Sequence, residues 1–247
     1  MDWIEHQEPA LTDGGSVRLV AYVGQAADGR YDNPHHGLSE PQAYRVDTPP
    51  GQPPLRTHFH TVDQFQYVGW GAGRIGSHPV AAGCLHYADR FTPYGPLRAG
   101  DGGYSYLTLR GTTDMGISYM PESRHELADR LGRLGRDPNG RRSLTLDLRS
   151  VVAAPGPGGW TRLVDDADGL VIAVADCAAG QDVQAPEIGS AGAWLVVVDG
   201  AAVGAGDAGV PVGPGAVRWC DPGSSPTVVA GEIGARVALL AFPDGGS

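Results

Sequence analysis

The chain has 247 residues, of which 41% are hydrophobic, so it is long enough for two β domains of about 100–120 residues each. Its net charge of −10 at pH 7 offers no attraction to a polyanion, which argues against nucleic acid as a partner. All 18 basic residues are arginine, so chemistry through a lysine Schiff base is excluded.

Cysteine usage and the N-terminal segment bear on the compartment. Cys84, Cys177 and Cys220 are widely spaced and form no CxxC pair, which argues against a disulfide framework or a zinc ribbon. The N-terminal segment is acidic without an apolar stretch, and no apolar run approaches the 18 residues of a membrane span. We therefore expect a cytoplasmic protein with no membrane partner.

The first half of the chain reads as β structure. Short apolar runs recur about every ten residues between Gly, Pro and Asp turns, a spacing typical of all-β sandwiches and barrels. These runs are SVRLVAYV, AYRVDT, LRTHFHT, QFQYVGW, CLHYADRFT and YSYLTLR. We predict a first domain over residues 1–121.

A helical segment follows these runs. Ser123 to Glu126 fits a capping box, and Leu127, Leu131 and Leu134 continue with helical spacing up to a DPNG turn at 137–140. We predict a linker helix over about 122–136 within a connecting segment of 122–142.

The second half returns to β runs and resembles the first. Its runs are SLTLDLRSVV, LVIAVADC, AWLVVVDG, AVRWC, TVVA and RVALLAF. Both halves contain a β run that ends in Gly and a Pro/Gly-rich corner before the last strand, which indicates that one barrel unit was duplicated. We predict that the second copy spans residues 143–247.

The stretch LRTHFHTVDQFQYVGWG carries the clearest chemical signal. In a strand, residues i and i+2 face the same side, so His58 and His60 project together, and Gln64 opens the next strand nearby. Two imidazoles and one oxygen donor could hold a metal ion. The alternative is a pair of polar residues on the solvent face of a strand.

This stretch resembles the first motif of the cupin superfamily. His58, His60, Gln64 and Gly71 match its spacing, with Gln in place of the usual Glu, and PYGPLR at 93–98 resembles the start of the second motif. The resemblance implies two jelly-roll, antiparallel β-barrels joined by the short helix, with a divalent ion in the first. Fe(II) is the first expectation, with Zn, Mn, Ni or Co as alternatives.

The chain departs from the family where a fourth, histidine ligand is expected, because Arg98 stands there. We predict His86 as the replacement ligand; a core or pocket histidine hydrogen-bonded to a carboxylate is the alternative. Gln64 is either a ligand or a group that only supports the ligands. Tyr94 and Arg98 are candidate catalytic residues, since Arg98 could grip a carboxylate.

The second barrel lacks such a site, because Gln181–Ser247 contains no histidine. The leading hypothesis is therefore a metal-dependent enzyme, acting at the first barrel on a small organic molecule, with oxygenation at Fe(II) as one option. The alternatives are a non-oxidative isomerase, lyase or cyclase and a cupin that binds a small molecule without turnover. The apolar runs LVIAVADC and AWLVVVDG favour a homodimer.

Overall fold

A computed structural model describes residues 4, 18–23, 40–114, 116–128, 143–152, 159–203 and 210–244. It divides into two compact units, Pro9–Asp147 with Ser247, and Met1–Glu8 with Leu148–Gly246. We call them the first and the second barrel. The division falls between Asp147 and Leu148 because the strand Ser143–Asp147 pairs within the first unit.

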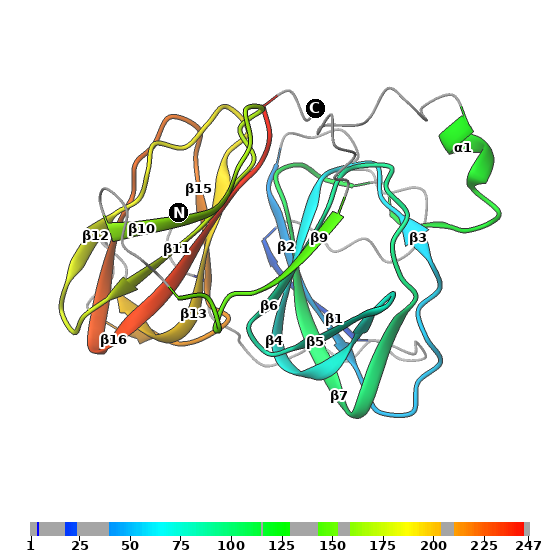
Figure 1. The fold of residues 1–247 in the computed structure, drawn as a ribbon, viewed down its shortest axis with the longest axis horizontal. Helices are drawn as coiled ribbons and strands as arrows, with labels where there is room; N and C mark the ends of the chain where they lie inside the picture. The colour runs from blue at the N-terminus through cyan, green and yellow to red at the C-terminus, as the bar shows by residue number, and fades with distance from the viewer. Residues whose placement is uncertain are drawn as a thin grey trace. The chain divides into compact units, whose positions relative to one another are not determined.

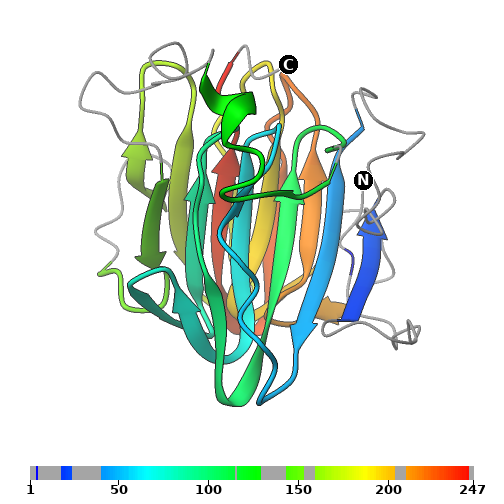
Figure 2. The same ribbon diagram turned by 90° about the vertical axis from the view of Figure 1, so that its right-hand side faces the viewer.

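The first barrel consists of antiparallel strands and one short helix (Figures 1 and 2). Its main sheet has the order β1-β2-β7-β4-β6-β9, with β5 also paired to β4, while β3 and β8 form a two-stranded sheet. The elements are β1 (Arg18–Val23), β2 (Gln42–Thr48), β3 (His58–Phe59), β4 (Gln64–Ile75), β5 (His78–Ala81), β6 (Cys84–Ala88), β7 (Leu97–Arg110), β8 (Ser118–Tyr119), α1 (Arg124–Ala128) and β9 (Ser143–Asp147).

The second barrel repeats this pairing scheme. Its sheet has the order β10-β11-β16-β13-β14, with β12 also paired to β16 and β15 to β13. The strands are β10 (Trp160–Asp165), β11 (Val171–Cys177), β12 (Asp182–Gln184), β13 (Ala193–Val203), β14 (Pro211–Val212), β15 (Val217–Cys220) and β16 (Thr227–Ala241). Pairing of β4 with β5, β6 and β7 thus corresponds to pairing of β13 with β14, β15 and β16.

One glycine corner shows the duplication most directly. Gly71 and Gly200 have φ values of +73° and +72°, and a Cβ on either would lie 2.3 Å from the carbonyl oxygen of Gly103 or Gly234. Register shifts flank both glycines in β4 and β13. The Gly that ends the motif therefore allows the same bulged close approach of two strands in each barrel.

The predicted linker helix is described only in part. The helix α1 begins at Arg124 and ends at Ala128, beyond one end of the long strands of the first barrel (Figure 2). The rest of the prediction, residues 129–142, lies outside the described residues. No helix among the described residues is long and apolar enough to cross a membrane.

Candidate functional site

A layer of polar side chains lies at one end of the first barrel's interior. Strand alternation places residues 42, 64, 66, 86 and 110 on inward faces, and the register pairs Arg110 with both Gln42 and Gln64, and Gln66 with His86. All five side chains are buried. Towards the other end, the same faces carry Val46, Val68, Tyr104 and Tyr106 of the core. The polar layer is therefore enclosed.

The two motif histidines lie at this layer. His58 and His60 are 1% and 8% exposed, so the alternative of a solvent-facing pair is wrong. Their ring centroids are 5.3 Å apart with an interplanar angle of 87°. The isolated bridge between His58 and Tyr94, together with pairing of β3 with β8, holds the pair against the barrel.

Each motif histidine is held by its Nδ1 atom. His58 Nδ1 lies 2.7 Å from the carbonyl oxygen of Arg56, and His60 Nδ1 lies 2.6 Å from Asp114 Oδ2 and 3.0 Å from the carbonyl oxygen of Gly116. The Arg56 carbonyl only accepts, so His58 Nδ1 carries the proton and its Nε2 keeps its lone pair. His60 Nδ1 also lies 3.0 Å from Arg110 Nη2, which only donates, but the shorter contact with the Asp114 carboxylate favours the proton on Nδ1 there too. Burial lowers the pKa of His58 to about 3 and also lowers the pKa of His60. Both imidazoles are neutral at pH 7.

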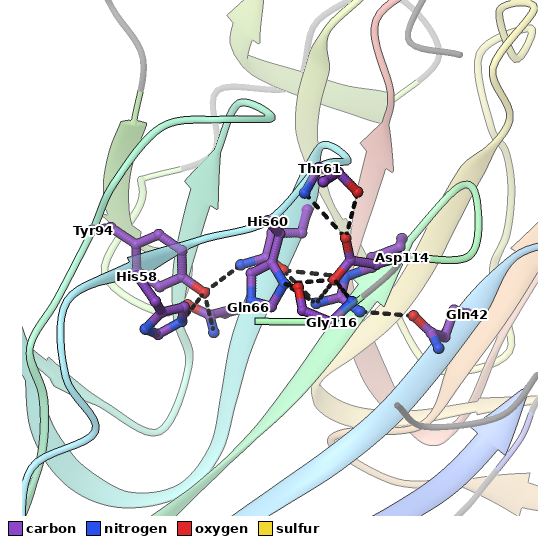
Figure 3. Close-up of polar contacts among 10 residues, drawn as sticks. Gln42, His58, His60, Thr61, Gln66, Tyr94, Asp114 and Gly116 are labelled. Carbon is purple, nitrogen blue, oxygen red and sulfur yellow. Dashed lines mark hydrogen bonds and ion pairs between the residues drawn. The ribbon is translucent and has the colours of Figure 1, made fainter. Parts of the chain in front are cut away.

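Tyr94 occupies the space beside these rings (Figure 3). Its hydroxyl oxygen lies 2.9 Å from His58 Nε2, 2.5 Å from Gln64 Nε2 and 3.3 Å from Gln66 Nε2. Because the amide groups donate to the hydroxyl oxygen, the hydroxyl proton is directed to the unprotonated His58 Nε2. Burial raises the pKa of Tyr94 well above its usual value, so the phenol is neutral without a further ligand.

A buried ion pair completes the layer on the far side of His60. Arg110 donates to Gln42 Oε1 at 2.7 Å and to Gln64 Oε1 at 2.9 Å, and its Nη2 lies 3.5 Å from Asp114 Oδ2. Thr61 donates to Asp114 Oδ1 through its backbone N–H and its hydroxyl (Figure 3). Burial alone would raise the pKa of Asp114, but the charge of Arg110 and these bonds hold it well below its usual value.

His86 also lies beside Tyr94. The ring centroids of His86 and Tyr94 are 5.2 Å apart, and His86 Nδ1 lies 2.9 Å from Thr145 Oγ1. Burial lowers the pKa of His86 to about 4. Its Nε2 atom and Gln66 Oε1 are buried with no hydrogen-bond partner among the described residues. The Gln66 oxygen therefore has an unsatisfied lone pair, whereas the Thr145 hydroxyl can donate or accept and leaves either ring nitrogen of His86 able to carry the proton.

The donors fit a divalent ion by their chemistry but are not gathered around one point. Two neutral imidazoles, His58 and His60, are held through Nδ1 by oxygens of the protein, which is usual for histidines that bind a metal through Nε2. Within the described ranges, however, no three His, Cys, Asp or Glu side chains form a group that could hold a metal ion. The Tyr94 ring packs against both His58 and His86, at centroid distances of 4.6 and 5.2 Å, and the oxygen of Gln64 is engaged by Arg110.

The structure thus brings together His58, His60, Gln64 and Tyr94. His86 contacts this group through the ring of Tyr94. It does not bring Arg98 to them, because Arg98 is exposed on β7, where it pairs with Arg74. The buried arginine of the site is Arg110, which the motif comparison overlooked. The alternation Tyr104, Tyr106, Thr108, Arg110 within YSYLTLR is the signal that places it on the inward face.

Asp114 and Gln66 were overlooked as well. Gln66 lies two residues after Gln64 in the same strand, so strand alternation predicts that both side chains point to the same face. Asp114 lies after β7 in the irregular segment before β8, where periodicity carries no information.

The described strands of the second barrel contain no equivalent polar layer. Arg110 pairs with Gln42 and Gln64 in the first barrel, and at the corresponding positions of the second barrel Ala241 pairs with Val171 and Ala193. Ala193 and Ala241 belong to an apolar interior cluster, against which Val171 packs. Among the described residues, the positions that match the polar layer are therefore apolar in the second barrel.

Comparisons with known proteins bear on the fold. No family model and no curated protein matches the chain. Among solved structures it is similar to a presumed dioxygenase from Nostoc punctiforme PCC 73102, with 14% identity, coverage of 100% of this chain and 81% of that one, and a TM-score of 0.61.

Two further structures extend the likeness. The oxalate decarboxylase of Bacillus subtilis, described with Mn(II) centres, has 14% identity, covers 96% and 75% of the two chains and gives a TM-score of 0.56. The pirin YhhW from Escherichia coli, in complex with nickel(II), has 11% identity, covers 98% of both chains and gives 0.54. At these identities the likeness establishes the fold.

Proposed function

Since this chain has the cupin fold, we propose that its first barrel binds one divalent metal ion and acts as a metal-dependent enzyme on a small organic molecule. The observation that supports the proposal is the set of neutral, buried imidazoles whose Nδ1 atoms are held by protein groups. Carbonyl and carboxylate groups that support ligand histidines through the other ring nitrogen are usual at metal sites.

His58 and His60 are the proposed ligands through Nε2, since their rings are close and nearly perpendicular. The hydroxyl oxygen of Tyr94, 2.9 Å from His58 Nε2, is the nearest oxygen donor, and phenolate oxygen is a known ligand of iron. His86 Nε2 is a further ligand if Tyr94 moves aside. Gln64 is a supporting group, since Arg110 holds its oxygen while its amide donates to Tyr94.

When bound, the ion would supply Lewis acidity towards a carbonyl or carboxylate oxygen, and Fe(II) would add the redox chemistry of oxygenation. The chain's own residues have separate tasks. Arg110 and Asp114 orient His60 and Gln64, while Tyr94 shares a proton with His58. The enclosed layer keeps water from these groups, which strengthens each polar interaction. We also propose that the bound ion is Fe(II) and that the protein assembles as a homodimer.

Metal titration of the chelator-treated full chain tests the proposal. We expect one Fe(II), Mn(II), Ni(II) or Zn(II) ion per chain, lost in the His58→Ala, His60→Ala double variant. His125→Ala is the matched control, because His125 is exposed on α1. Gln64→Ala should weaken binding less than His60→Ala. Stoichiometric metal in the double variant would show that the ion binds elsewhere.

Binding without turnover is the second candidate function. It is favoured by the packing of Tyr94 against both His58 and His86 and by the fixed charge of Arg110, whose Nη2 lies 3.0 Å from His60 Nδ1 and opposes a second cation. In that case the wild type would bind none of the four ions, and small-molecule binding would not respond to chelator.

A further inference from the structure

The two buried charges beside the motif histidines oppose each other (Figure 3). Asp114 Oδ2 lies 2.6 Å and Arg110 Nη2 lies 3.0 Å from the same atom, His60 Nδ1. Both side chains are 0% exposed, and the two charged groups are 3.5 Å apart. A cation bound at the other nitrogen of this ring would be attracted by Asp114 and repelled by Arg110 from similar distances, so the two effects largely cancel.

Gln64 adds no charge to the polar layer. The cupin motif usually has Glu at this position, and the side chain of Gln64 is buried. Its oxygen accepts hydrogen bonds from Nε and Nη2 of Arg110 at 3.2 and 2.9 Å. A carboxylate there would neutralise Arg110 and leave the charge of Asp114 to balance a cation. The amide cannot do so, because it is neutral.

The other buried carboxylates described in the first barrel belong to a different face of the sheet. Asp63 Oδ1 and Asp89 Oδ1 lie 3.2 and 2.8 Å from the hydroxyl oxygen of Tyr87. Tyr87 follows His86 directly in β6, so strand alternation directs these two side chains to opposite faces. Among the described residues, the buried side chains of the polar layer therefore carry no net negative charge.

A divalent ion at His58 and His60 would thus lack a sufficient counter-charge. Tyr94 is a neutral phenol, and loss of its proton would offset only one of the two positive charges. A buried charge without a counter-charge costs free energy, so the ion binds better with an anion beside it. Two imidazoles also leave coordination positions of the ion open, and an oxygen donor can occupy one of them.

We propose that a small carboxylate compound completes the metal site of the first barrel, so that the divalent ion and the carboxylate bind cooperatively at His58 and His60. The proposal rests on the proposed function, because it names the class of molecule that the metal site would take. Gln64 and Arg110 determine this specificity, since together they withhold the counter-charge. The coupling is reciprocal, so the ion raises the affinity for the carboxylate by the same factor as the carboxylate raises the affinity for the ion.

The test is a competition titration of the full, chelator-treated chain with Zn(II) against a chromophoric chelator, at an ionic strength held constant with sodium perchlorate. We expect saturating acetate to raise the affinity for Zn(II) about 5- to 150-fold and acetamide, its neutral analogue, to have no effect. Gln64→Glu places a carboxylate beside Arg110, so the variant should fold, bind Zn(II) more tightly without acetate and respond little to acetate. Gln184→Glu, the same substitution at an exposed position of β12, is the matched control and should behave as the wild type.

Three outcomes would overturn the proposal and leave the metal site intact: equal affinity for Zn(II) with and without acetate, an equal effect of acetamide, or an undiminished acetate effect in Gln64→Glu. An acetate effect that persists in the His58→Ala, His60→Ala double variant would also overturn it, because the ion and the anion would then meet elsewhere. Absence of Zn(II) binding under every condition would contradict both the proposed function and the coupling.

Discussion

Acidification should destabilise the first barrel through its buried histidines. His58, His60 and His86 are neutral in the folded protein, with pKa values lowered by burial, to about 3 for His58 and about 4 for His86. In the unfolded chain each imidazole regains a pKa near 6.5. The unfolded state therefore binds more protons below pH 6.5, and stability falls as the pH decreases.

The size of the effect follows from the number of groups. At pH 5.5 each unfolded imidazole gains about 1.4 kcal/mol from protonation, so three of them lower the free energy of unfolding by about 4 kcal/mol relative to pH 7.5. Total stabilities of domains are about 5–15 kcal/mol. The loss for His58 continues down to about pH 3 and that for His86 to about pH 4.

Urea unfolding of chelator-treated protein at several pH values between 7.5 and 5.5 measures this effect. The slope near pH 5.5 should correspond to uptake of almost three protons on unfolding, and His86→Gln should remove about one of them. His125→Gln, on the exposed helix, is the control for loss of an imidazole. A slope of less than one proton in the wild type would show that these histidines are not held neutral by the fold.

Three further outcomes are expected. Arg110→Met and Asp114→Leu should each cost about 3–5 kcal/mol in urea unfolding by leaving a buried charge unpaired, whereas the double variant should lose much less than the sum. Gly71→Ala and Gly200→Ala should each lower stability by more than about 1 kcal/mol, because both have positive φ and a crowded Cβ position, whereas Gly69→Ala, with open space around it, should not. Light scattering at high concentration should give twice the monomer mass of 25.7 kDa; the monomer mass would contradict the homodimer.

The sequence by itself determined the class of fold and the pairing of the two motif histidines. Alternating apolar and polar residues give each strand one face to bury, and regular turns separate the strands, so an antiparallel β fold follows from the local pattern. The HxH spacing placed His58 and His60 on one side of a strand. These features depend on residues close together in the chain.

Only the tertiary structure decided which other groups meet the histidines. Arg110 reaches Gln64 across 46 residues because β7 pairs with β4 in one register, and that register also leaves Arg98 exposed. Tyr94 contacts both His58 and His86 from the segment before β7. Strand alternation assigns a side chain to a face, but neighbouring strands and their register are set by the packing of the whole barrel.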